Sequence, residues 1–96
     1  MYNLKNKTAL RTGGGRDIGG EISKKLAGLG AKVCFNYFES DGKGEATLEA
    51  IKQAGGEAMM VKGDLTKQSD VDALVKACTD AYGGKIDILI NVAGGL

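Results

Sequence analysis

A glycine-rich segment near the N-terminus has the composition of an anion-binding turn. Residues 12–20 read Thr-Gly-Gly-Gly-Arg-Asp-Ile-Gly-Gly and lie between a short apolar run and a stretch with helical apolar spacing. Glycines let the backbone adopt positive φ and approach a ligand closely, and the first N–H groups of a helix attract negative charge. The segment therefore predicts a phosphate site, although glycines between a strand and a helix also occur for turn geometry alone.

Side chains suited to acid–base or metal chemistry are scarce. The 96 residues contain no histidine, which removes the commonest general base and the commonest metal ligand. The two cysteines, Cys34 and Cys78, have no paired spacing and are expected to be buried reduced thiols. We therefore expect no metal site, and any chemistry must use other groups.

The composition fits one small globular domain. Hydrophobic residues make up 43% and charged residues 26%, and the net charge is +1 with no basic block. No apolar run approaches the roughly 20 residues that span a bilayer, and the N-terminus lacks the apolar region of a signal peptide. We expect a cytoplasmic protein with no nucleic-acid or membrane partner.

Strand-like and helix-like segments alternate along the whole chain. The predicted strands are residues 7–10, 32–37, 57–62 and 86–90, and the predicted helices are residues 18–29, 44–54 and 69–82. Glycines end the helices, with Gly30 in the C′ position of the first. Strands joined by such helices form right-handed crossovers and a parallel sheet. We therefore expect an α/β fold, a doubly wound Rossmann-like sheet of four strands and three helices in the order 3-2-1-4.

Four loops of the predicted fold converge on one edge of the sheet. The glycine-rich turn, residues 36–40, Asp64 and residues 91–95 all follow predicted strands. Open parallel sheets bind ligands in the crevice at the carboxyl ends of their strands. This convergence supports a ligand site more strongly than the turn does by itself.

Three motifs resemble those of a known family, the short-chain dehydrogenase/reductases. Residues 12–19 resemble the family's Thr-Gly-x-x-x-Gly-x-Gly cofactor turn. Residues 63–65 resemble its adenine-side loop, and residues 87–94 resemble its Asn-Asn-Ala-Gly strand end. The similarity covers essentially the whole chain, and the branch of 3-oxoacyl-acyl-carrier-protein reductase looks most similar.

The resemblance implies an oxidoreductase that transfers hydride between a nicotinamide cofactor and a carbonyl or alcohol substrate. Residues 1–96 would be the dinucleotide-binding half of a Rossmann-type domain, truncated after the fourth strand. The partner is then a dinucleotide, NADP or NAD, and we expect a homo-oligomer for the complete protein.

The resemblance also implies roles for single residues. Gly13 and Gly19 would permit the close approach of the pyrophosphate, and the Ile18 backbone would donate to it. Asp64 would accept a hydrogen bond from the adenine amino group, with the Leu65 backbone beside it. The residues that would line the riboses are Asn91, Ala93 and Gly94. Taken singly, each of these residues is also typical of turn geometry.

The end of the second predicted strand bears on the choice between NADP and NAD. A carboxylate there favours the free ribose 2′-OH of NAD, whereas a nearby cation favours the 2′-phosphate of NADP. The strand ends in Asn36 and Tyr37, and Arg16 lies in the glycine-rich turn. These residues favour NADP, while Glu39 would reverse the preference if its loop folds back.

Three positions depart from the family pattern. Asp17 replaces the usual middle glycine; aspartate suits the start of a helix, but its charge repels a pyrophosphate unless a cation offsets it. Val92 replaces the second asparagine of the strand-end motif and removes one side-chain amide. Arg11 places a cation inside a central strand, where it needs a partner, and no account of it follows from the sequence.

The catalytic groups of the family are missing from the chain. Members use a Tyr with a Lys four residues later, together with a Ser and an Asn, and none of the tyrosines here has a lysine at that spacing. We therefore expect no catalytic residue within these 96 residues, and whether the chain acts as an enzyme by itself is left open. The fourth strand would also lack an outer neighbour, leaving Ile88 and Ile90 beside an open edge.

Two other interpretations fit parts of the same pattern. A non-catalytic α/β module would use the glycine turn structurally and pair with another chain through its exposed strand edge. A flavodoxin-like domain, such as a response regulator, would need an acidic cluster after the first strand, where this chain has Gly13, Gly14 and Gly15.

Overall fold

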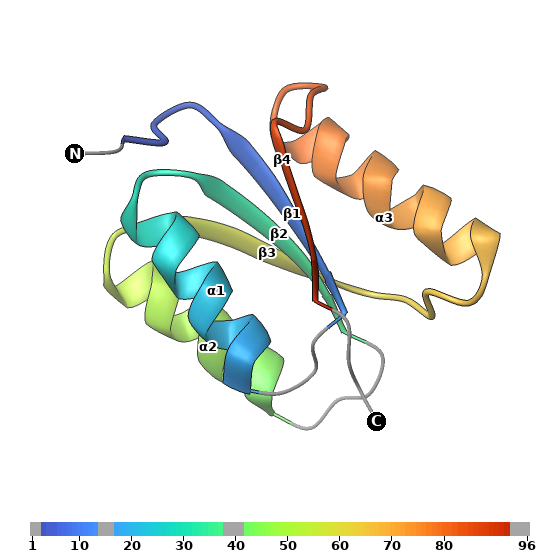
Figure 1. The fold of residues 1–96 in the computed structure, drawn as a ribbon, viewed down its shortest axis with the longest axis horizontal. Coiled ribbons are helices and arrows are strands. Elements are labelled where there is room, and N and C mark those ends of the chain that lie inside the picture. The colour runs from blue at the N-terminus through green and yellow to red at the C-terminus, as the bar shows by residue number, and fades with distance from the viewer. Residues whose placement is uncertain (1–2, 14–16, 38–41, 93–96) are drawn as a thin grey trace.

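The computed structural model describes residues 3–13, 17–37 and 42–92. Strands and helices alternate along the chain as predicted (Figure 1). The strands are β1 (Thr8–Gly13), β2 (Lys32–Tyr37), β3 (Glu57–Lys62) and β4 (Ile88–Val92), and the helices are α1 (Asp17–Gly28), α2 (Lys43–Gln53) and α3 (Gln68–Ala81). No helix in the described part of the chain is long and apolar enough to cross a bilayer.

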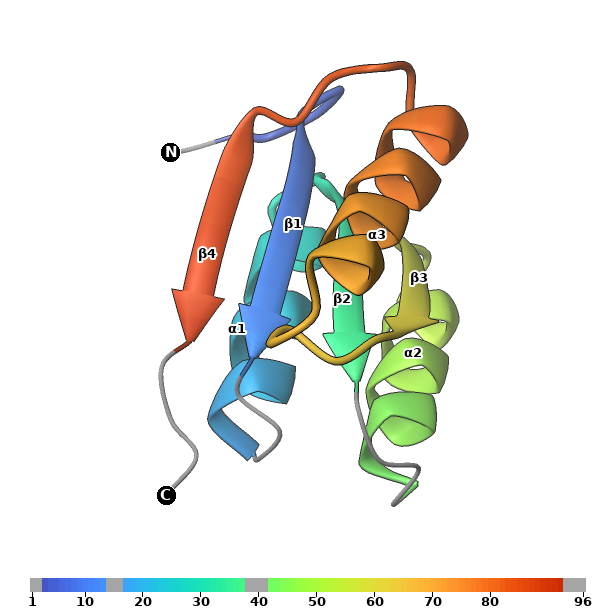
Figure 2. The same ribbon diagram turned by 90° about the vertical axis from the view of Figure 1, so that its right-hand side faces the viewer.

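The four strands form one parallel sheet in the order β3-β2-β1-β4, which confirms the predicted order. The chain winds outward from β1 through β2 to β3 and then returns through α3 to place β4 on the other side of β1. Helices α1 and α2 cover one face of the sheet, and α3 lies on the opposite face (Figure 2). This is a doubly wound, Rossmann-like arrangement whose strand order reverses beside β1.

The pairing of β4 with β1 corrects the predicted limits of both strands. The sequence predicts strands over residues 7–10 and 86–90, but the observed register runs from Ala9 opposite Ile88 to Gly13 opposite Val92. Both strands continue because each supplies the other's hydrogen-bonding partners, which no local pattern encodes. Asp87 comes just before β4, and its N–H donates to the Thr8 carbonyl at 2.9 Å.

Alternate residues of the central strands supply an apolar core on each face of the sheet. Val33 and Phe35 belong to the core under α1 and α2, whereas Cys34 packs with Leu74 and Cys78 under α3. Neighbouring side chains of a strand point to opposite faces, so a strand covered on both sides is apolar throughout. The burial of each large apolar side chain contributes about 1.5–3 kcal/mol to stability.

The two cysteines are free, buried and adjacent, which confirms the prediction of reduced thiols. Burial raises the pKa of Cys34 to about 12, and the neighbouring Cys78 adds to the effect. Burial also raises the pKa of Cys78. Both thiols are therefore protonated at neutral pH and are poor nucleophiles.

The turn after α1 depends on Gly30. Its φ of 104° is the left-handed conformation predicted for the C′ position. A Cβ at this residue would also lie 3.0 Å from the backbone N of Lys5. The N-terminal segment is held nearby by a hydrogen bond of 2.7 Å from the Leu4 N–H to the Leu29 carbonyl. Glycine is therefore needed for both the backbone conformation and the close approach.

Candidate functional site

The carboxyl ends of the four parallel strands lie at one edge of the sheet, here called the carboxyl edge. Figure 2 shows the four arrowheads at this edge, together with the first turns of α1 and α2. The segment that leaves β3 runs back across the edge before α3 begins. The edge gathers the described residues predicted for the site, which are Gly13, Ile18, Gly19, Asn36, Tyr37, Asp64, Leu65 and Asn91. The predicted residues Arg16, Ala93 and Gly94 lie outside the described part of the chain.

The change from strand to helix occurs within the predicted glycine-rich segment. β1 ends at Gly13 and α1 begins at Asp17, the residue expected to begin this helix. Ile18 and Gly19 therefore belong to the first turn of α1. The N–H groups of a first turn have no partner within their helix, and the helix dipole places positive potential there. The carboxyl edge can thus offer backbone donors to an anion.

Thr12 and Asn91 join β1 to β4 at the same edge. They are directly opposite in the sheet, and the Thr12 hydroxyl donates to Asn91 Oδ1 at 3.1 Å. This bond orients the amide of Asn91 and leaves its Nδ2 as a donor at the carboxyl edge. The sequence indicated Asn91 but not its dependence on Thr12, because the two residues are 79 positions apart.

Asn36 links the ends of β2 and β3. It is 7% exposed, and its Nδ2 donates to the Gly63 carbonyl at 3.4 Å. The Gly63 N–H in turn donates to the Tyr37 carbonyl at 2.8 Å. Asn36 therefore holds the segment after β3 against β2, a role that the sequence did not indicate.

Asp64 presents an oriented carboxylate at the carboxyl edge. Its Oδ1 accepts hydrogen bonds from the Thr66 N–H at 2.9 Å and from the Thr66 hydroxyl at 2.7 Å. The hydroxyl bond first, and then the N–H bond, lower the pKa of Asp64, so this carboxyl is ionised at neutral pH. Within the described residues both bonds to the carboxylate use Oδ1, so Oδ2 can accept from a ligand.

The hydrogen-bonding partners of Asp64, Thr66 and Asp70, were not singled out from the sequence. The Asp64 N–H donates to Asp70 Oδ2 at 2.8 Å, which joins the segment to the first turn of α3. Leu65, between Asp64 and Thr66, is 38% exposed and places an apolar side chain at the edge. The available signal was the Asp-x-Thr spacing, since aspartate commonly accepts from the backbone two residues on.

Arg11, which the sequence left unexplained, lies in β1 two residues before Gly13. It is 4% exposed, and its Nε donates to the Ser23 hydroxyl of α1 at 3.0 Å. Its Cζ lies 4.7 Å from the ring centroid of Phe35, the residue opposite it in β2. A cation over an aromatic face is attracted by the ring's quadrupole. Burial lowers the pKa of Arg11, but guanidinium titrates so far above neutrality that it stays charged.

Tyr82 lies at the other end of the sheet, next to the start of β1. Its carbonyl accepts from the Thr8 hydroxyl at 3.3 Å, and the Lys32 Nζ is 5.9 Å from its ring centroid. Burial raises the pKa of Tyr82 to about 12. Tyr82 is therefore a very weak acid that is remote from the carboxyl edge.

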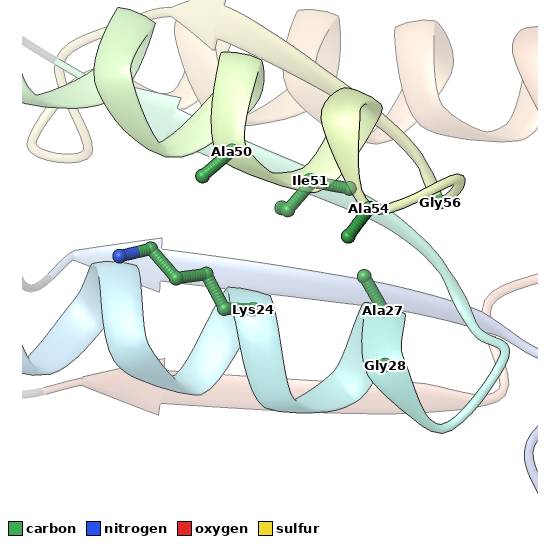
Figure 3. A pocket seen from close by; sticks show the side chains of 7 residues that line it. All are labelled: Lys24, Ala27, Gly28, Ala50, Ile51, Ala54 and Gly56. Carbon is green, nitrogen blue, oxygen red and sulfur yellow. The ribbon is translucent and has the colours of Figure 1, made fainter.

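A hollow of about 160 Å³ lies between α1 and α2, away from the carboxyl edge (Figure 3). Small apolar residues and one lysine line it: Lys24, Ala27, Gly28, Ala50, Ile51, Ala54 and Gly56. They come from the later turns of both helices and from the loop before β3. Ligand pockets usually measure roughly 300–1,000 Å³, so the hollow is too small for a dinucleotide. The candidate site is therefore the carboxyl edge.

Known proteins resemble the chain in both sequence and structure. The sequence profile of the family described as short chain dehydrogenase matches residues 7–96. The short-chain dehydrogenase/reductase homolog YusS of Bacillus subtilis (strain 168) is 44% identical over 91 residues, which cover 95% of this chain and 83% of that protein. The short-chain dehydrogenase/reductase from Serratia marcescens BCRC 10948 is 36% identical with a TM-score of 0.90, over 98% of this chain and 38% of that one. A metagenomic short-chain oxidoreductase in complex with NADP is 35% identical with a TM-score of 0.85, over 96% of this chain and 41% of that one.

The chain spans only a little over a third of most of these relatives. Three further curated relatives, each 37–41% identical, are covered over 38%, 35% and 36% of their lengths. The likeness to them therefore concerns one part of a longer protein.

Proposed function

The chain belongs to the short-chain dehydrogenase family, and we propose that residues 1–96 form the dinucleotide-binding half of a Rossmann-type oxidoreductase domain. The complete enzyme would transfer hydride between a nicotinamide cofactor and a carbonyl or alcohol substrate. One observation carries the proposal: the end of β1, the start of α1 and the segment that leaves β3 lie at the same carboxyl edge of the sheet (Figure 2).

The start of α1 is the proposed site of the cofactor's pyrophosphate. Gly13 and Gly19 allow the backbone to come close to it, and the Ile18 N–H donates to it. The first-turn donors are oriented before any ligand arrives, so binding costs little reordering.

Asp64 is the proposed acceptor for the adenine amino group. Its Oδ1 is engaged by Thr66 while the carboxyl stays ionised, which fits an acceptor with one oxygen available to a ligand. Leu65 lies beside the adenine, and Asn91, Ala93 and Gly94 line the riboses.

We infer a preference for NADP over NAD. β2 ends in Asn36 and Tyr37, so the described end of this strand offers no carboxylate to a ribose 2′-OH. Arg16 supplies a cation for the 2′-phosphate. The relative in complex with NADP supports the same choice.

The nicotinamide cofactor, when bound, supplies or accepts the hydride. The residues of this chain bind and orient it, and Tyr82 is too weak an acid and too remote to donate the accompanying proton. We propose that the family's Ser, Tyr and Lys come from polypeptide outside residues 1–96.

A fluorescence titration of the chain with NADPH tests the proposal. We expect saturable binding at or below millimolar cofactor, weaker binding of NADH, and competition by ADP. Circular dichroism on the same sample shows whether the chain is folded. A folded chain that binds no NADPH at millimolar concentration would refute the proposal.

A second candidate is a non-catalytic module that pairs with another chain through β4. This strand is at the edge of the sheet, and its most exposed large apolar residue is Leu89, at 64%, rather than Ile88 or Ile90. Ile88 packs instead against the core under α1 and α2. Leu89 is opposite Leu10, which belongs to the core under α3, so Leu89 lies on the α3 face of the sheet. On that face α3 does not extend over β4 (Figure 2). A concentration-dependent dimer that Leu89→Lys abolishes, in a chain without NADPH affinity, would favour this function.

A further inference from the structure

The peptide group between Gly63 and Asp64 is held at both of its polar atoms by side chains from other elements. Its carbonyl accepts a hydrogen bond from Asn36 of β2 at 3.4 Å, and its N–H donates to Asp70 Oδ2 of α3 at 2.8 Å. A hydrogen bond to a carboxylate is stronger than one between neutral groups. The peptide plane is therefore fixed between β2 and α3, and this plane sets the direction in which the Asp64 side chain leaves the backbone.

Two separate sets of hydrogen bonds orient Asp64. Thr66 donates to Oδ1 of Asp64 through its N–H at 2.9 Å and its hydroxyl at 2.7 Å, and these bonds fix the rotation of the carboxylate. Asp70 fixes the backbone from which that carboxylate projects. The position of Oδ2 of Asp64, the oxygen proposed to accept from adenine, therefore depends on both.

The carboxylate of Asp70 reaches past the start of its own helix. Asp70 is the third residue of α3, whose N-cap is Lys67. In a capping box, an acidic side chain at this position accepts from the N-cap N–H. Here the Lys67 N–H donates to the Asp64 carbonyl at 3.0 Å, whereas Asp70 accepts from the Asp64 N–H, six positions earlier. The bond of Asp70 thus holds the segment that carries Asp64.

We propose that Asp70 is a positioning residue for adenine recognition: by accepting the Asp64 N–H, it orients the Asp64 carboxylate toward the adenine amino group. The inference rests on the proposed function, because that function assigns Asp64 to adenine. Asp70 does not touch the ligand and acts through Asp64. Loss of its bond lets the peptide group rotate and leaves the carboxylate poorly aligned.

The test compares two ligands that differ only in the base. ADP carries the adenine amino group, whereas inosine diphosphate has a carbonyl oxygen in its place, which a carboxylate cannot bind. NMR titration of the 96-residue chain measures both dissociation constants. Their ratio reports the bond to the amino group, because the ribose and the diphosphate are common to both ligands. We expect inosine diphosphate to bind about ten-fold more weakly than ADP.

Substitutions at Asp70 should change this ratio according to whether they keep an acceptor. Asp70→Ala should lower the ratio from about ten to about three, because the Asp64 carboxylate remains but is no longer aligned. Asp70→Asn keeps an acceptor oxygen, and its ratio should stay within about two-fold of that of the original chain. If Asp70→Ala does not fold, Asp70→Leu replaces it, because leucine keeps the bulk of the side chain without an acceptor.

Two further variants calibrate the measurement. Asp64→Ala removes the acceptor itself and should bring the ratio to about one. Asp72→Ala removes an exposed carboxylate from the same helix, one that is bonded to Gln68, and should leave the ratio unchanged.

Each outcome bears on a different claim. An unchanged ratio in Asp70→Ala or Asp70→Leu would overturn the positioning role, and so would a ratio as low in Asp70→Asn as in Asp70→Ala. Equal constants for the two ligands in the original chain would remove Asp64 from the adenine site, and the inference with it. Failure of the folded original chain to bind NADPH or ADP at all would refute the proposed function instead.

Discussion

The two ends of the sheet use their aspartates differently. At the amino end, Asp87 engages both carboxylate oxygens within the protein: Oδ2 accepts from the Thr8 N–H at 2.9 Å, and Oδ1 lies 3.2 Å from Lys85 Nζ. At the carboxyl edge, the hydrogen bonds that Asp64 accepts within the described residues use Oδ1 alone. The amino end is closed by its own bonds, whereas the carboxyl edge keeps an acceptor and the first N–H groups of α1 for a ligand. The comparison separates residues that stabilise the fold from residues proposed to bind the cofactor.

The largest effect is expected at the amino end, from Gly30→Ala. The substitution forces an L side chain into a φ of 104° and places its Cβ 3.0 Å from the Lys5 N. We expect the free energy of unfolding, measured with urea, to fall by about 2–3 kcal/mol. The NADPH affinity of the folded variant should not change.

Gly28→Ala is the matched control for this substitution. Gly28 is the last residue of α1, and a Cβ there would meet nothing within 4 Å. Alanine should leave the free energy of unfolding unchanged or raise it by up to about 1 kcal/mol. An equal loss in both variants would contradict the role given to Gly30.

At the carboxyl edge, a substitution should weaken NADPH binding and leave stability nearly unchanged. Asp64→Ala removes the proposed acceptor for the adenine amino group, and we expect NADPH to bind about ten-fold more weakly while thermal stability changes little. Asp72→Ala is the control, because Asp72 is an exposed residue of α3 bonded to Gln68. Unchanged NADPH affinity in Asp64→Ala would remove Asp64 from the site.

Acid should lower the stability of the protein by protonating Asp87 at the amino end of the sheet. The bond from the Thr8 N–H, and then the contact with Lys85, lower the pKa of Asp87 below its usual value of 3.8. The contribution of this carboxylate to stability is therefore complete above about pH 4 and is lost as the pH falls through the lowered pKa.

Asp87→Asn tests this assignment, because asparagine keeps an acceptor for Thr8 but does not titrate. We expect its Tm to be lower by a few degrees at pH 7, on the order of 5 °C, and to fall less steeply than that of the original chain below pH 4. Parallel curves for the two proteins would show that other carboxyls govern acid unfolding.

The smallest effect is expected at the start of α1. Asp17→Gly removes a negative charge from the proposed pyrophosphate site, so NADPH should bind about three-fold more tightly. Calorimetric titration measures the difference. Equal or weaker binding would mean that the charge of Asp17 does not oppose the ligand.

The elements of the fold were predictable because their signals are local. Apolar periodicity and glycines such as Gly30 mark each helix within a few residues of its ends. The order of the strands followed from their alternation with helices. The limits of β1 and β4 were not predictable, since the pairing of Gly13 with Val92 joins segments at opposite ends of the sequence.

The residues that hold the site in place were harder to predict from the sequence than the residues of the site itself. Glycine and aspartate positions are visible as motifs, so Gly13 and Asp64 could be named in advance. The contacts of Arg11 with Ser23 and Phe35 depend on how a helix and a second strand pack on β1. Such contacts are tertiary, and no spacing of residues in the sequence predicts them.

The bonds between β1 and β4 constrain the order in which the protein assembles. Thr8 with Asp87 and Thr12 with Asn91 each span 79 positions, so β1 cannot complete its pairing until β4, at the other end of these residues, has been synthesised. Closing so long a loop is entropically costly, and topologies dominated by distant contacts fold slowly. During synthesis, β1 must therefore wait with one side unpaired until β4 emerges from the ribosome.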